Sequence, residues 1–189
     1  MLDLKLIGAI VGLTSYIPIV TSLSKENTGV EQNFATWMLW AMLDTIATIS
    51  TILEHGKNFW LQGGFVLGSV VVTILLIKRK QTKWTIYETV VSFLVFCCLV
   101  FWYLKGNDAG IIASVVATCI AGIPQLFLTY KKPATTPTLT YLLFSLGGFI
   151  SFIGGTAWTV EERLFSGETA VSCLIIVLLS MRKIKQLTS

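Results

Sequence analysis

Charged residues are scarce in this sequence. They make up 13% of the 189 residues, whereas a soluble domain usually has about 25%. Hydrophobic residues make up 54%, the mean hydropathy is +0.76, and the charges cluster between long apolar runs. This pattern excludes an ordinary soluble domain and indicates an integral membrane protein whose partner is the lipid bilayer. The net charge of +4 comes from predicted loops and gives no indication of a nucleic-acid partner.

Residues that bind metals or act as nucleophiles are also few. The one histidine, His55, lies in a predicted loop, and the cysteines Cys97, Cys98, Cys119 and Cys173 lie inside apolar runs without zinc-ligand spacing. We therefore predict no metal site and no cofactor, and we interpret the cysteines as small core residues. We find no nucleotide-binding loop, no Ser/His/Asp set and no pair of carboxylates at one depth, so we do not predict an enzyme.

Long apolar runs dominate what is present. About 20 apolar residues cross a bilayer as a helix, and by that rule the sequence predicts an all-α protein with seven spans. The predicted spans are 4–23, 34–54, 59–77, 85–104, 109–130, 138–158 and 168–181. Every connection between them is short, so no extramembrane domain is expected.

Basic residues are distributed unevenly between the two predicted sides. One side carries Lys5, Lys57, Lys105 and Arg163. The other carries Lys25, Lys78, Arg79, Lys80, Lys83, Lys131, Lys132, Arg182, Lys183 and Lys185. Because the basic side of a membrane protein faces the cytosol, we expect the N-terminus outside and the C-terminus in the cytosol. The short loops and the lack of an Asn-x-Ser/Thr sequon favour a bacterial inner (plasma) membrane.

Two parts of the sequence, 17–80 and 123–183, resemble each other. The matched segments are Ile17-Pro18 with Ile123-Pro124, 37–40 with 141–144, and 69–80 with 172–183, at separations of 106, 104 and 103 residues. Two three-helix units in the same orientation need one linking span between them. The sequence therefore predicts a three-plus-one-plus-three arrangement: a first bundle over 1–80, a linker helix within 81–106, and a second bundle over 107–189.

A Pro-Gln motif occurs at Pro124-Gln125, after Ala-Gly-Ile and before a loop that contains Lys131-Lys132. A partial copy of this motif occurs at Pro18, where Ile19 stands in place of glutamine. On this motif and the predicted topology, the chain resembles the PQ-loop and SWEET superfamily of small membrane transporters. The resemblance implies alternating access, with Pro18 and Pro124 as hinges. It also gives Gln125 the PQ-loop role, and we include Gln125 among the candidate substrate-binding residues.

Asp44 is the most distinctive polar residue, since it lies near the middle of the span predicted at 34–54. A charged residue there costs about 2.5–3.5 kcal/mol or more unless it is paired, hydrated or protonated. Helical spacing places Trp37, Trp40, Asp44, Thr48 and Thr51 along one face. That face suits a polar ring, a sugar or a cationic amine, and Asp44 is also our candidate for proton coupling.

A structural role for the same residues is the alternative. Asp44 would then be hydrogen-bonded to Tyr16 or to another helix, and the two tryptophans would only pack. The matching position in the second repeat is Gly148, so any charged site is expected to be one-sided.

Two other patterns have structural explanations. Gly147, Ser151 and Gly155 form a small-residue stripe, which is typical of helix packing. Thr85-x-x-Glu88 is typical of a capping box at the start of a helix.

The leading hypothesis is a carrier that moves a small polar solute by alternating access, with or without proton coupling through Asp44. Its solute would be vitamin-like or nucleoside-like, an amino acid, or a sugar. The alternative is a non-transporting membrane receptor or assembly factor on the same seven-helix scaffold, which should show a basic pocket for a peptide carboxylate.

Overall fold

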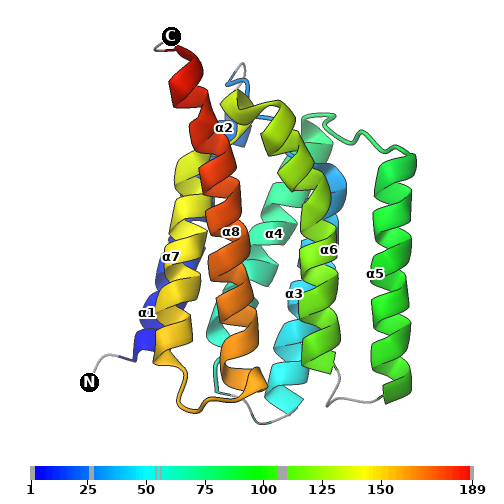
Figure 1. The fold of residues 1–189 in the computed structure, drawn as a ribbon, viewed down its shortest axis with the longest axis vertical. Coiled ribbons are helices and arrows are strands. Elements are labelled where there is room, and N and C mark those ends of the chain that lie inside the picture. Colours follow the sequence, from blue (N-terminus) through cyan, green and yellow to red (C-terminus); the bar gives the residue numbers. More distant parts are fainter. Residues whose placement is uncertain (1–2, 26–27, 54, 56, 106–109, 188–189) are drawn as a thin grey trace.

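The computed structural model describes residues 3–25, 28–53, 55, 57–105 and 110–187, and their regular structure is helical throughout (Figure 1). The elements are α1 (Leu4–Thr14), α2 (Tyr16–Ser24), α3 (Phe34–Leu53), α4 (Trp60–Lys78), α5 (Ile86–Lys105), α6 (Gly110–Lys131), the 3₁₀ turn η2 (Pro133–Thr135), α7 (Thr138–Gly154) and α8 (Val160–Leu187). The prediction of an all-α protein is confirmed for this part of the chain.

Six helical segments of the described chain are long and apolar enough to cross a bilayer. They are Leu4–Ser24, Phe34–Leu53, Trp60–Lys78, Ile86–Lys105, Ile111–Lys131 and Glu162–Arg182. The seventh apolar helix, Thr138–Gly154, is shorter at 17 residues. These lengths and compositions indicate a membrane-embedded protein. Residues 54 and 109, at two predicted span ends, lie outside the described residues.

The predicted start of the last span at residue 168 is wrong. The helix α8 already begins at Val160, about two turns earlier. Glu162 and Arg163 made this segment too polar to count as part of a span. In the structure Glu162 instead accepts hydrogen bonds from backbone N–H groups of neighbouring loops, so the helix continues through it.

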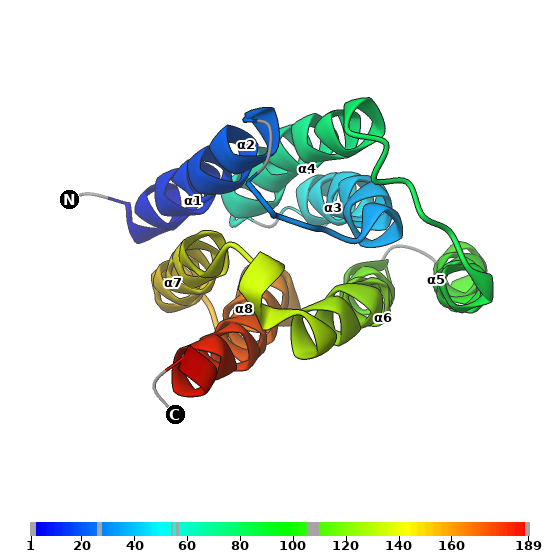
Figure 2. The same ribbon diagram turned by 90° about the horizontal axis from the view of Figure 1, so that it is seen from above.

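With α1 and α2 counted as one segment, Leu4–Ser24, the helices other than α5 form two groups of three that face each other (Figure 2). In one group α4 lies between α1 and α3, and in the other α8 lies between α6 and α7. Across the middle, α1 packs on α7 and α3 packs on α6. The helix α5 packs mainly on α6 and lies at the edge of the molecule (Figures 1 and 2).

The contact between α1 and α7 depends on glycines. A Cβ added at Gly8 would lie 2.7 Å from the backbone nitrogen of Ser151, and one at Gly147 would lie 2.7 Å from that of Gly12. Only residues without a side chain let the two backbones approach so closely. The interpretation of the small-residue stripe as a packing surface is confirmed for Gly147 and Ser151.

Each predicted hinge proline lies at a different kind of irregularity. The first span is interrupted at Ser15, whose hydroxyl donates to the carbonyl of Gly12, and Pro18 follows three residues later. Pro124 lies inside the uninterrupted α6, whose second half leans towards α8 (Figure 1). A proline removes one helical N–H and kinks the helix. The hinge movement at both prolines stays a prediction.

The cysteines do not all lie in the core. Cys173 is buried and Cys98 is half-buried, but Cys97 and Cys119 are exposed on the outside of the bundle. The prediction of four small core residues is therefore wrong for Cys97 and Cys119. An apolar run has no polar face to show which side of the helix points outward, so the sequence alone could not separate them.

Candidate functional site

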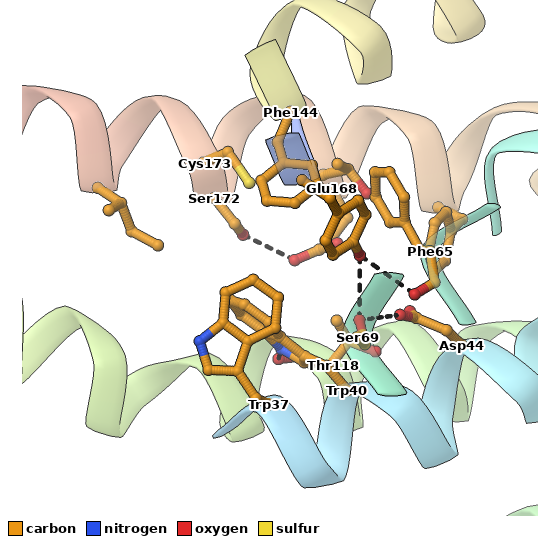
Figure 3. A pocket seen from close by; sticks show the side chains of 14 residues that line it. Trp37, Trp40, Asp44, Phe65, Ser69, Thr118, Phe144, Glu168, Ser172 and Cys173 are labelled. Carbon is orange, nitrogen blue, oxygen red and sulfur yellow. Dashed lines mark hydrogen bonds between the residues drawn. The ribbon is translucent and has the colours of Figure 1, made fainter. Parts of the chain in front are cut away.

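A cavity of about 40 Å³ lies between the two helix groups, halfway along the bundle (Figure 3). Its volume is enough for about three water molecules. The lining residues are Tyr16, Trp37, Trp40, Asp44, Phe65, Ser69, Thr118, Phe144, Phe165, Glu168, Thr169, Ser172, Cys173 and Ile176. Both helix groups contribute to this set, which makes the cavity the candidate binding site.

Aromatic rings form much of the cavity wall. The Tyr16 ring meets the Phe144 ring edge to face with centroids 4.8 Å apart, and Trp37 meets Trp40 in the same way at 5.3 Å. Phe65 packs against both Tyr16 and Phe144. Such edge-to-face pairs stabilise by about 0.5–1.5 kcal/mol beyond the area they bury. These rings therefore form a well-packed aromatic cluster around the cavity.

Asp44 contributes one carboxylate to the cavity and is 3% exposed. The hydroxyl of Ser69 on α4 donates to its Oδ2 over 3.4 Å, and Ser69 Oγ lies 3.0 Å from the hydroxyl of Tyr16 (Figure 3). The hydrogen bond to another helix that the structural alternative predicts is therefore present, and Ser69 links Asp44 to Tyr16. At 3.4 Å this hydrogen bond is long, so it compensates the charge of the Asp44 carboxylate only weakly.

Glu168 contributes a second carboxylate from α8, on the other helix group. Its Oε1 accepts a hydrogen bond from Ser172 Oγ at 2.7 Å (Figure 3). It also accepts a long hydrogen bond from Cys119 Sγ at 3.5 Å. Glu168 is not among the predicted site residues, and a one-sided charge was expected. The predicted last span begins at residue 168, which would place Glu168 at the edge of the membrane. With α8 starting at Val160, Glu168 instead lies two turns inside the helix.

Asp44 and Glu168 line the same cavity from opposite helix groups. None of the residues that line the cavity is a lysine, arginine or histidine. Among the side chains that the structure describes, the one ion pair joins Lys132 to Glu31 at the protein surface. Two carboxylates that share a low-dielectric site disfavour each other's charged form. The cavity therefore lacks a compensating positive charge of its own.

Gly148 lies at a backbone contact, which explains why the second repeat has no acid there. A Cβ added to Gly148 would lie 2.8 Å from the backbone nitrogen of Ala170 on α8. No side chain fits at that point without moving α8. The second carboxylate is therefore supplied by α8 itself, from Glu168.

The predicted site residues divide into two sets. Trp37, Trp40 and Asp44 line the cavity as the helical spacing indicated. Thr48 does not line it, and its hydroxyl donates to the carbonyl of Asp44 at 2.7 Å. Trp40 Nε1 donates to the carbonyl of Thr118 on α6 at 3.1 Å, so Trp40 also joins the two helix groups.

Gln125 lies away from the cavity, fully buried near the C-terminal end of the bundle, which is at the top of Figure 1. Its Oε1 accepts a hydrogen bond from the backbone N–H of Asn33 at 2.9 Å, directly before α3 begins. The side chain of Asn33 in turn accepts from the N–H of Thr36 at 3.0 Å. Gln125 and Asn33 thus satisfy N–H groups at the start of α3 that the helix leaves free.

Glu88 completes this polar group. Its carboxylate accepts from the backbone N–H and from the hydroxyl of Thr85, and the bond to the N–H measures 2.8 Å. The prediction of a capping box is confirmed. The other oxygen, Oε1, accepts from the side-chain amide of Asn33 at 3.0 Å, which ties α5 to the beginning of α3.

The C-terminal end of the bundle is closed above the cavity. The side-chain oxygen of Gln32 accepts hydrogen bonds from the hydroxyl of Tyr141 at 2.7 Å and from Nε1 of Trp37 at 3.2 Å. Gln32, Trp37 and Tyr141 are all buried. A residue of the loop before α3 therefore holds together a tryptophan of one helix group and a tyrosine of the other.

A second polar cluster lies at the opposite end of the bundle, the end where the chain begins. The amide of Asn58 donates to the carbonyl of Glu162 at 2.6 Å, and its oxygen accepts from the hydroxyl of Ser151 at 2.9 Å. Asn58 precedes α4, whereas Ser151 and Glu162 belong to α7 and α8. This contact also joins the two helix groups, so polar contacts link the groups at both ends of the bundle.

The chain matches no family model, no curated protein and no solved structure. Among the described residues, no group of three or more His, Cys, Asp or Glu side chains could hold a metal ion.

Proposed function

We propose that this protein is a small-solute carrier that works by alternating access and that the structure represents its occluded state. The observation that carries this proposal is the central cavity, which both helix groups line and which separate polar contacts close at either end. A carrier must pass through a state in which its site is open to neither side.

The arrangement of the helices supports a three-plus-one-plus-three organisation. If α6, α7 and α8 repeat α1, α3 and α4, the third helix of each unit lies between the other two. In the first unit α4 lies between α1 and α3, and in the second α8 lies between α6 and α7. The helix α5 then serves as the linker that keeps the two units in the same orientation. We propose that the units rock about Pro18 and Pro124 so that the Gln32 and Asn58 contacts open in turn, in a membrane with the N-terminus outside.

A receptor on the same scaffold fits the cavity less well. A pocket for a peptide carboxylate needs a positive charge. The residues that line this cavity instead include two carboxylates and no basic side chain.

Uptake by the purified protein in liposomes tests the proposal. A thermal-shift screen against sugars, amino acids, vitamins and nucleosides first selects a solute, and its uptake is then measured. We expect Asp44→Asn and Trp40→Ala to reduce uptake at least tenfold in folded protein, because both side chains face the cavity. An imposed proton gradient is then applied, and increased uptake would show coupling.

Thr45→Ala is the matched control, because Thr45 lies next to Asp44 but is exposed and bonds only to the carbonyl of Ala41. Its uptake should equal that of the unmodified protein. Undiminished uptake in both cavity variants would show that the site is misplaced, and no uptake of any screened solute would count against a carrier.

A further inference from the structure

We propose that the solute of the central cavity is a small organic cation, which places its positive nitrogen between Asp44 and Glu168 and its carbon surface against the tryptophan rings. This inference rests on the proposed function, since it names the class of solute that the carrier would take. It starts from the two carboxylates that face one cavity from opposite helix groups.

Each carboxylate is held by a serine at a matching place in the two halves. Ser69 on α4 donates to Asp44, and Ser172 on α8 donates to Glu168. These two serines are 103 residues apart, the separation at which the third helices of the two halves align. The acids themselves come from different positions, but the serines orient both towards the space between the halves (Figure 3).

The charge in the cavity is unbalanced. Besides the two acids, the titratable groups that line it are Tyr16 and Cys173, and Cys119 approaches Glu168 from α6. None of these groups is a cation. Asp44 is 3% exposed, and the side chain that donates a hydrogen bond to it is the neutral Ser69. A bound cation would compensate both carboxylates at once.

The aromatic wall suits the same ligand. Trp37 and Trp40 line the cavity beside Asp44, and tryptophan attracts organic cations through its ring face more strongly than the other aromatic residues do. A sugar would instead need several hydrogen-bonding groups, and much of this wall is aromatic carbon. The combination of two acids and two indole rings favours an alkylammonium group over a neutral polyol.

Glu168 also borders a groove at the side of the bundle. It lines a second, open cavity of about 350 Å³ together with Trp158 and Arg163. Arg163 lies over the Trp158 ring at 3.9 Å, and its guanidinium donates to the carbonyl of Gly155 at 2.7 Å. Glu168 therefore lies between the central cavity and a groove that contains a basic side chain.

The central cavity is too small for such a solute in the observed state, so the two helix groups must separate slightly to admit it. A cation between Asp44 and Glu168 would then attract both halves and favour closure. The site would thus recognise the solute and promote occlusion with the same two carboxylates.

Binding to the full chain in lipid nanodiscs tests the inference without transport. The probes are choline and benzylammonium, each paired with a neutral molecule of similar shape, 3,3-dimethyl-1-butanol and benzyl alcohol. Affinity is measured by calorimetry and by tryptophan fluorescence. We expect both cations to bind at least tenfold more tightly than their neutral partners. Asp44→Asn and Glu168→Gln should each weaken cation binding at least tenfold.

Glu31→Gln is the control for loss of an acid outside the cavity and should leave cation affinity unchanged, since Glu31 pairs with Lys132 at the surface. Asp44→Glu and Glu168→Asp keep the charge and should retain measurable cation binding, which separates loss of charge from misfolding. Equal binding of the neutral partners, absence of cation binding, or unchanged affinity in both charge-neutral variants would overturn the inference. Uptake of a neutral solute in liposomes could still succeed in that case, whereas cation binding without uptake would count against the carrier function alone.

Discussion

Glycines that look alike in the sequence have different surroundings in the structure. Gly147 faces the backbone of α1, where an added Cβ would lie 2.7 Å from the nitrogen of Gly12. The nearest atom to a Cβ added at Gly63 would be Cγ2 of Thr48 at 3.9 Å, an ordinary contact. A backbone atom cannot give way as the end of a side chain can, so only the first position requires glycine.

Gly147→Ala should therefore destabilise the protein. Forcing a methyl group into a well-packed contact costs about 1–3 kcal/mol, so the thermal unfolding midpoint in detergent should fall by several degrees. Gly63→Ala makes the same chemical change in open surroundings and should leave the midpoint unchanged or raise it. Equal effects of the two substitutions would show that α1 and α7 are not in close backbone contact.

At the scale of the helix, the beginning of α3 depends on side chains from two other helices. Gln125 of α6 accepts the N–H of Asn33, and Glu88 of α5 accepts from the Asn33 amide. This arrangement gives the glutamine of the Pro-Gln motif a direct structural role. Pro124, one residue earlier, lacks its own N–H, so any movement of α6 at the proline would be transmitted to the start of α3.

Replacing Gln125 should lower the stability of the protein, whereas replacing another buried glutamine should not. Gln125→Leu leaves the N–H of Asn33 without its partner, which should destabilise by about 1–3 kcal/mol. The side-chain oxygen of Gln62 has no hydrogen-bond partner within the described part of the chain, so Gln62→Leu should be neutral or stabilising. Chemical denaturation of both variants in mixed micelles gives the comparison, and a stable Gln125→Leu protein would contradict this role.

On the scale of the whole molecule, the two ends of the bundle differ in basic residues. Lys57 lies in the loop before α4 at one end, and Lys83 follows α4 at the other. Both are exposed, and the end with Lys83 belongs to the side with the larger number of basic residues. The positive-inside rule therefore assigns Lys83 to the cytosol.

Cysteine labelling in intact cells measures this orientation. In a variant without the four native cysteines, Lys57→Cys should react with a membrane-impermeant maleimide from outside. Lys83→Cys should react only after the cells are permeabilised. The reversed pattern would show that the N-terminus faces the cytosol.

The sequence by itself determined the helical membrane class, most of the span limits, the capping box at Glu88 and the packing role of the stripe around Gly147. It also placed Trp37, Trp40 and Asp44 on one face. These features depend on local quantities, namely the length of an apolar run and the 3.6-residue period of a helix, which can be read from neighbouring residues.

Only the tertiary structure decided that Glu168 lies across the cavity from Asp44 and that Gln125 serves the start of α3. Both results depend on contacts between residues far apart in the chain. Glu162 remains within α8 because it binds the loops on either side, and that places Glu168 two turns inside the helix. A polar residue near the end of an apolar run does not by itself show whether it anchors the helix end or extends the helix, because the deciding hydrogen bonds come from elsewhere in the fold.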